Sequence, residues 1–138
     1  MNPNVATFLG FLAMAPIATL AQAQCSMQTL KGQYVFTGRG YIEPDDPGVQ
    51  RVHRGVLVFD GAGTVSGKQT SSRAGKIGHE KPQGTYTLKA DCSGTMTFGP
   101  VATPGAQIHW DYYVTQDGRI GYMIRTDAGS MAVRSFEK

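Results

Sequence analysis

The chain has 138 residues, of which 41% are hydrophobic and 17% are charged, and its formal net charge is +3. A chain of this size buries one core rather than two. The Lys and Arg residues are scattered without a basic run, so we expect no nucleic-acid partner. No phosphate-binding or dinucleotide-binding motif is present, and we expect no cofactor.

The N-terminal segment differs in character from the rest. The run from Val5 to Ala21 is 17 residues long, uncharged and interrupted by Pro16, which is short for a membrane-spanning helix of about 20 residues. It is followed by Ala21-Gln22-Ala23, which suits signal peptidase. We therefore expect residues 1–23 to be a signal peptide and residues 24–138 to be one domain, secreted or periplasmic in a bacterium, with no membrane span after cleavage. A membrane anchor is the alternative.

The chain has two cysteines, Cys25 and Cys92. Outside the cytoplasm thiols oxidise, and two cysteines allow one intramolecular pairing. The alternatives are a metal pair or a redox pair, but metal sites use more ligands at closer spacing and redox pairs usually read C-x-x-C. We predict a Cys25–Cys92 disulfide, which in the chain-entropy model stabilises the fold by roughly 4 kcal/mol.

Glycine-containing turns separate short stretches rich in Val, Ile, Thr, Tyr and Phe, a pattern typical of strands. Eight strands are predicted, at residues 32–42, 50–59, 64–71, 84–89, 95–100, 107–115, 119–126 and 130–136. The turns FDGAGT, ADCSGT, TQDGRI and TDAGSM each place a glycine where positive φ is useful. EPDDPGV and SRAGKIGHEKP are predicted to be longer loops, the second one solvated.

The last three strands predict a register. A bulged turn at QDG pairs Trp110 with Ile124, Tyr112 with Tyr122, and Val114 with Ile120. This face is wholly large and apolar or aromatic, so we expect it to point inward. Met131 and Val133 join the same face, whereas His109, Asp111 and Arg125 are predicted to point outward.

An antiparallel meander of eight strands has a natural end point in closure, which removes its free edges. The sequence predicts an all-β fold, a single eight-stranded antiparallel meander barrel, with a two-sheet β-sandwich as the alternative. Such a barrel has room for packed side chains or one small ligand. In the second strand we place Leu57 and Phe59 inside, which also turns His53 inward near the mouth.

Three segments, GVLVFDGAGTVSG, QGTYTLKADCSGTMTF and DGRIGYMIRTDAG, resemble a largely uncharacterised family of small secreted bacterial proteins. In that family a strand ending in F-D-G-x-G precedes G-T-Y-x-x-x-x-D-C-x-G and a terminal hairpin. The resemblance spans most of residues 30–136 and implies an eight-stranded barrel similar to allene oxide cyclases and dirigent proteins. No carboxylate of this chain matches an allene oxide cyclase site, so no site residue is transferred.

The predicted lumen is aromatic. Its expected ligand-binding residues are Tyr34, His53, Tyr86, Trp110, Tyr112 and Tyr122, with Phe36 and Phe98 beside them. An apolar pocket with a few hydroxyls and one imidazole suits a small aromatic or terpenoid-like molecule, and the alternative is a filled core.

Three functions follow from this lumen. The first is a binder of a small, mostly apolar molecule. The second is a cofactor-free cyclase or isomerase in which His53 is the candidate base and Tyr112 the candidate acid. The third is a structural or protein-interaction module. The three histidines show no metal-ligand spacing, so we expect no metal site.

Overall fold

The computed structural model of the protein describes residues 24–41, 49–99 and 104–138, so the predicted signal peptide lies outside the described residues. Within them the chain forms two short 3-10 helices and nine strands. The helices are η1 (Met27–Leu30) and η2 (Pro104–Ala106), and the strands are β1 (Gly32–Tyr41), β2 (Gln50–Phe59), β3 (Thr64–Arg73), β4 (Lys76–Glu80), β5 (Gln83–Leu88), β6 (Ser93–Phe98), β7 (Ile108–Val114), β8 (Ile120–Arg125) and β9 (Met131–Glu137).

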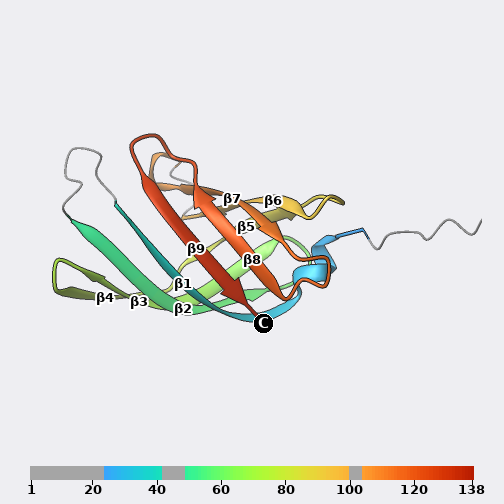
Figure 1. Ribbon diagram of the computed structural model, residues 1–138, viewed down its shortest axis with the longest axis horizontal. Coiled ribbons are helices and arrows are strands. Elements are labelled where there is room, and N and C mark those ends of the chain that lie inside the picture. The colour runs from blue at the N-terminus through green and yellow to red at the C-terminus, as the bar shows by residue number, and fades with distance from the viewer. Residues whose placement is uncertain (1–23, 42–48, 100–103) are drawn as a thin grey trace, which may run out of the picture.

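Eight of these strands close into an antiparallel barrel, as the sequence predicts (Figure 1). Within the barrel each strand pairs with the next, with β3 pairing with β5, and β9 returns to pair with β1 through Val35 to Tyr41. In a closed barrel each strand has a hydrogen-bonded neighbour on both sides along its paired length. An open sandwich leaves the edge strands of each sheet with a neighbour on one side only. The fold is therefore a barrel and not the alternative two-sheet sandwich.

Strand β4 is a correction to the prediction, because it forms where a solvated loop was expected. It pairs with the end of β3, which runs on to Arg73. β4 and β5 follow one continuous register along β3, with Gln69 opposite Glu80 and Ser66 opposite Gln83. Pro82 lies between them, where the missing N–H interrupts a ladder. β4 thus prolongs the β5 strand beyond the closed ring.

Three of the four predicted glycine turns have the expected left-handed residue. Gly61, Gly118 and Gly129 all have positive φ. In ADCSGT, however, it is Cys92 that takes φ 66°, while Gly94 lies in β6, where a Cβ would overlap the Tyr112 ring. That glycine is needed for close packing rather than for the turn.

One end of the barrel, which we call the base, is closed by η1. Leu30 is fully buried there, and the predicted disulfide is confirmed, with the Cα atoms of Cys25 and Cys92 5.1 Å apart. The bond ties the segment before η1 to the β5–β6 turn. The opposite end, where β1 ends and β2 begins, is the mouth.

The base half of the lumen is filled with aromatic side chains. Tyr34 packs edge-on against Phe59 and Phe136, with ring centroids 5.2 and 5.5 Å apart, a favoured geometry for aromatic pairs. Leu57 and Phe59 are buried, so the predicted inward face of β2 is confirmed. Burial of this aromatic layer leaves the base without room for a ligand.

The predicted register of the last hairpins is wrong by one residue in β8 and β9. Trp110 and Tyr112 point inward as predicted, but they pair with Arg125 and Met123. Tyr122 and Ile124 therefore face outward, 63% and 50% exposed.

The same shift carries into β9, where Met131 and Val133 are exposed and Ala132, Arg134 and Phe136 face inward. A one-residue shift moves every side chain to the other face. Of the three residues predicted to point outward, His109 and Asp111 are exposed, whereas Arg125 lies on the inner side opposite Trp110.

The cause of the shift is the β7–β8 turn. Thr115 N–H donates to Ile120 O, so the loop has four residues and not the predicted bulged three. Asp117 holds this loop by accepting from the Thr115 hydroxyl and the Arg119 N–H. Gly121 then faces inward, where the Phe136 ring occupies the space that a Cβ would take.

Candidate ligand site at the barrel mouth

Strand alternation brings polar side chains together inside the mouth half of the barrel. His53 on β2, Trp110 on β7 and Arg134 on β9 all point inward and are 5%, 2% and 9% exposed. Arg51 on β2 and Glu80 on β4 lie nearer the rim. We call these five residues the mouth cluster.

Arg134 is the centre of the cluster. Its guanidinium carbon lies 4.4 Å from the ring centroid of Trp110, 5.2 Å from that of Phe36 and 5.9 Å from that of Phe98. These are cation–π contacts, but the side chain makes no hydrogen bond or ion pair with any described residue, and its Nε is fully buried. Burial, followed by the charges of Arg51 and Arg125, lowers the pKa of Arg134 to about 9. The group still carries its charge at neutral pH.

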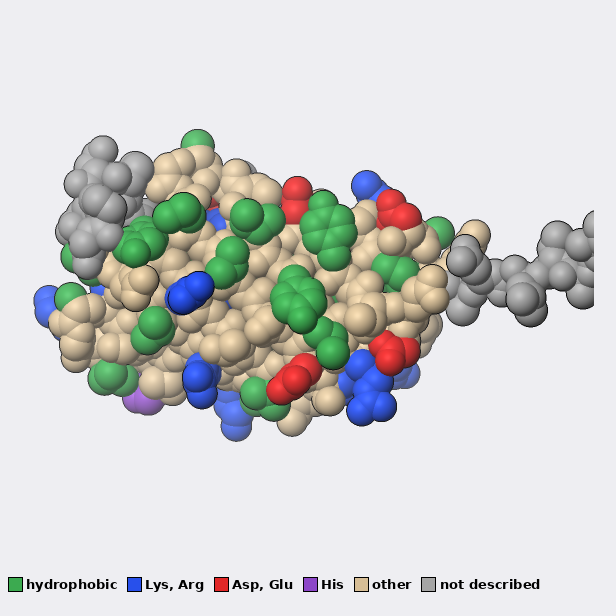
Figure 2. Space-filling model, viewed as in Figure 1, with side chains coloured by type: hydrophobic (Ala, Val, Ile, Leu, Met, Phe, Trp, Pro, Cys, Tyr) green, Lys and Arg blue, Asp and Glu red, His purple; other side chains and the backbone are tan. Residues whose placement is uncertain are grey.

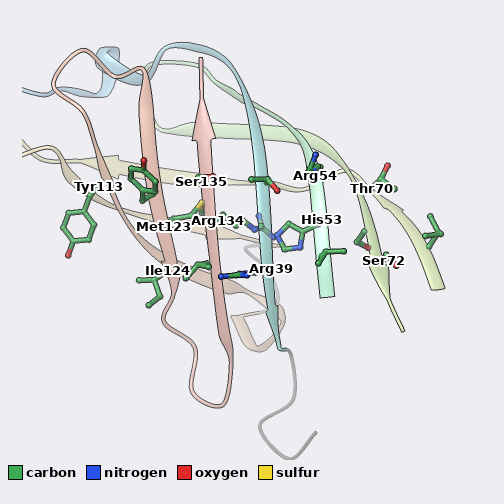
Figure 3. A pocket seen from close by; sticks show the side chains of 17 residues that line it. Arg39, His53, Arg54, Thr70, Ser72, Tyr113, Met123, Ile124, Arg134 and Ser135 are labelled. Carbon is green, nitrogen blue, oxygen red and sulfur yellow. The ribbon is translucent and has the colours of Figure 1, made fainter. Parts of the chain in front are cut away.

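His53 lies against Arg134, and both of its ring nitrogens are buried without a hydrogen-bond partner among the described residues. Burial, then the charges of Arg134 and Arg51, lowers the pKa of His53 to about 3. Gly38 on β1 makes this approach feasible, because a Cβ there would overlap both side chains. Figure 3 shows the His53 and Arg134 side chains close together beside β1.

The two other arginines near Arg134 have carboxylate partners. Arg51 Nη2 lies 2.6 Å from Glu80 Oε1, and Arg125 Nε lies 2.7 Å from Asp127 Oδ2. Although burial works to raise the pKa of Glu80, hydrogen bonds and the charge of Arg51 lower it overall. Burial also works to raise the pKa of Asp127, but hydrogen bonds from Arg125 and His109 lower it to about 2. Both partner carboxylates are therefore ionised at neutral pH, and among the described residues Arg134 remains without an ion-pair partner.

Two cavities meet at this cluster. The larger has a volume of about 490 Å³ and is bordered by Phe98, Ile108, Trp110 and Arg134 between the β4–β5 break and the β6–β7 connection. The smaller, about 30 Å³, is bordered by His53, Trp110 and all three arginines. Trp110 and Arg134 border both, so the polar void opens beside a cavity of mixed lining, in which Phe98, Ile108 and Trp110 lie among charged and amide side chains.

The structure divides the residues predicted to bind a ligand into three groups. His53 and Trp110 lie at the mouth. Tyr34, Tyr86 and Tyr112 are buried in the filled part of the lumen, and their hydroxyls donate to the carbonyls of Gly118, Met27 and Thr87. Tyr122 lies on the outer face, which corrects its predicted inward orientation.

The two residues considered for acid–base catalysis are not poised for it in this state. A histidine with a pKa of about 3 is a weak base at neutral pH, and burial raises the pKa of the Tyr112 hydroxyl. That hydroxyl donates to Thr87 O at 2.5 Å. Both environments suit fixed, neutral groups better than proton transfer.

Sequence reasoning did not identify Arg134, Arg51 or Glu80. Arg134 lies between Val133 and Ser135 in the sequence, and a charged residue in a strand is expected to face solvent. The available signal is alternation: if Phe136 is placed inside, Arg134 follows it inward two residues earlier.

A second feature, the outer face of the sheet, is also apolar. The paired residues Ile124, Val133, Arg39, Val52, Ser72 and Ile77 form a row across six strands. Next to this row lies the cross-strand pair Tyr113 and Tyr122. Together they line a shallow groove of about 1000 Å³ (Figure 3), and Figure 2 shows apolar side chains gathered over this face. We call this surface the outer groove.

The remaining histidines lie away from the mouth cluster. His109 pairs with Asp127 at 2.7 Å, and His79 on β4 lies 3.2 Å from the Thr70 hydroxyl. The described residues contain no group of three His, Cys, Asp or Glu side chains arranged to hold a metal ion. In the part of the chain that the structure describes, no helix has the length and apolar character needed to cross a bilayer.

Comparisons with protein-family models, with curated proteins and with solved structures find no match to this chain. The small antiparallel barrel agrees with the fold that the family resemblance implies. Membership of that family, and kinship with allene oxide cyclases, stay predictions based on turn and strand-end motifs. The disulfide fits a protein of an oxidising compartment.

Proposed function

We propose that the protein binds a small, mostly apolar molecule in the mouth half of its barrel. The observation that carries this proposal is that packing and hydrogen bonding differ between the base and the mouth of the lumen. The base is filled and its hydroxyls are hydrogen-bonded, whereas the mouth combines a cavity of about 490 Å³ with buried polar atoms that have no hydrogen-bond partner among the described residues. Apolar walls supply contact area and a few polar groups fix orientation, as in known ligand pockets.

The binding role is favoured over a cofactor-free cyclase or isomerase. Proton transfer at neutral pH needs a group whose pKa lies near 7. Burial and the neighbouring arginines lower the pKa of His53 to about 3. The predicted catalytic pair of His53 and Tyr112 therefore lacks the main property that the reaction requires.

The outer groove is the observation that favours the third alternative, an interaction module. Exposed apolar patches often mark contact surfaces. The groove also reaches His53 and Arg134 beside Gly38, so substitutions of those two residues affect both surfaces. Ile108 borders the mouth cavities but not the groove, and Tyr122 borders the groove but not the mouth cavities, so substitutions of these residues distinguish the two alternatives.

The test uses Trp110, which is the only tryptophan of the chain. Residues 24–138 are titrated with geraniol, decanoate, naphthalene-1-acetamide and naphthalene-1-acetate while indole emission is recorded. We expect a saturable change with at least one probe. Ile108→Ala, which removes part of the mouth cavity wall, is expected to weaken binding, and Tyr122→Ala in the outer groove is the matched control that leaves it unchanged.

Two results would contradict the proposal. If no probe at millimolar concentration changes the emission, the mouth is a packed end of the barrel. The alternative function, a protein-interaction module, is then favoured. If Tyr122→Ala weakens binding while Ile108→Ala does not, the ligand occupies the outer groove.

A further inference from the structure

We infer that the mouth selects a ligand with a carboxylate group, and that Arg134 is the residue that recognises it. This inference rests on the proposed function and specifies the chemical class of the ligand: a small organic acid with an apolar body. The carboxylate is placed at the junction of the two cavities, and the body in the larger one.

The first argument is the missing partner of Arg134. A buried charge is normally paired and hydrogen-bonded, because burial without a partner is costly. Arg134 is 9% exposed and contacts the faces of three aromatic rings, yet it makes no hydrogen bond or ion pair with a described residue. An anionic ligand supplies the partner that the described residues do not provide.

The second argument is the set of donors around the small void. Trp110 Nε1 is a donor only, and a neutral histidine has one N–H donor. Trp110 Nε1, both His53 nitrogens and Arg134 Nε are all buried without partners among the described residues, and all three side chains border the void. Three of these groups are donors, Trp110 Nε1, Arg134 Nε and one His53 nitrogen, while the other nitrogen of the neutral His53 ring is an acceptor. A site in which donors outnumber acceptors is complementary to an oxyanion. Hydrogen bonds to charged groups are also the stronger kind.

The third argument is the local charge. Three guanidinium groups border the void, and two of them are compensated by Glu80 and Asp127. With His53 neutral, one positive charge remains among the described residues that border the void and their ion-pair partners. A singly charged carboxylate balances it, whereas a doubly charged phosphate exceeds it. The apolar side chains of Phe98 and Ile108 beside the site suit an organic body rather than a free inorganic ion.

The test compares an acid with its neutral counterpart of similar shape, naphthalene-1-acetate against naphthalene-1-acetamide, by isothermal titration calorimetry at neutral pH. We expect the acid to bind about tenfold tighter or more, since each 1.4 kcal/mol from charge-assisted hydrogen bonding gives a factor of ten. Inorganic phosphate is expected to compete weakly with the acid.

The decisive variant is Arg134→Met, which removes the charge and keeps an apolar stem. Replacing a buried unpaired cation with an apolar side chain is not expected to unfold the barrel. The preference for the acid should disappear while binding of the amide persists. Arg134→Lys retains the charge and should retain part of the preference. Arg39→Met is the matched control, because it removes the same charge from the outer face.

The outcomes separate the two claims. If acid and amide bind equally to the wild type, or if Arg134→Met keeps the preference, the carboxylate inference is overturned and small-molecule binding stands. If neither probe nor any member of the wider panel binds, the proposed function fails and this inference fails with it. If Arg39→Met lowers acid binding as much as Arg134→Met, the preference comes from net charge or from the outer groove that Arg39 lines, and the assignment to Arg134 in the mouth is overturned.

Discussion

At the scale of single residues, the mouth depends on how closely side chains can approach across the β1 backbone. Gly38 has no Cβ, so the His53 ring and the Arg134 side chain occupy the space in front of it. A glycine in a strand interior normally weakens the strand. Here the missing side chain of Gly38 leaves the space that the mouth cluster occupies. The sequence pattern G-R-G of residues 38–40 does not by itself indicate this packing role.

Substitution of Gly38 tests that role. We expect Gly38→Ala to lower the free energy of unfolding by about 1–3 kcal/mol, the usual effect of overpacking, and to weaken probe binding. Chemical denaturation measures the first effect and calorimetry the second. Gly105→Ala is the control, because a Cβ there meets no atom within 4 Å, and its effect should stay within about 0.5 kcal/mol. Equal effects of the two substitutions would show that Gly38 has no special packing role.

His53 makes the stability of the protein depend on pH. Its pKa is about 3 when folded, below the ordinary value of 6.5, because of burial and the charges of Arg134 and Arg51, with Glu80 acting in the opposite direction. The unfolded chain therefore binds a proton at higher pH than the folded chain does. Stability is fully present above pH 6.5 and is lost as pH falls from there toward 3.

The contribution of His53 is isolated by comparing wild type with His53→Gln in urea titrations between pH 7 and pH 5. In this window the carboxylates with lowered pKa values contribute little. The wild type should lose stability as pH falls, and the variant should show a flatter profile. Parallel profiles would show that His53 is not buried as a neutral group.

At the scale of elements, β8 and β9 have two faces that are almost equally apolar. Met123 and Phe136 face the core, while Tyr122, Ile124 and Val133 face solvent in the outer groove. When both faces are apolar, alternation does not specify which is inside, and the turn decides the register. The four-residue β7–β8 loop, held by Asp117, makes that decision.

Two neighbouring substitutions test the β8 register. Met123→Ala removes a core side chain and should cost about 2–5 kcal/mol of stability. Ile124→Ala removes a side chain from the outer groove and should cost about 0.5 kcal/mol or less. Thermal unfolding of both variants measures the difference. A larger loss for Ile124→Ala would restore the register predicted from the hairpin pattern.

At the scale of the whole molecule, the barrel, its eight strands and its disulfide could be predicted from the sequence because turn glycines and β-branched runs are local signals, whereas β4 and the full length of β3 could not. The inward faces of β1, β2 and β7 were also predictable, since the larger aromatic and aliphatic residues of each strand gather mainly on that face, although Val35, Val58 and Tyr113 lie on the outer face. The mouth cluster was not. It depends on Arg134 being buried against three rings, and no local signal specifies a charged residue in a core.

The central claim is that the mouth holds a small molecule, and the indole N–H of Trp110 reports on it most directly. A ¹H–¹⁵N spectrum contains one indole resonance, because the chain has one tryptophan, and its Nε1 has no partner among the described residues. On titration with naphthalene-1-acetate, this resonance and the amide of Ile108, which borders the mouth cavities but not the groove, should shift and saturate together, while Leu30 at the base stays fixed. An unchanged indole resonance, with shifts confined to Tyr122 and Ile124 in the outer groove, would contradict the account.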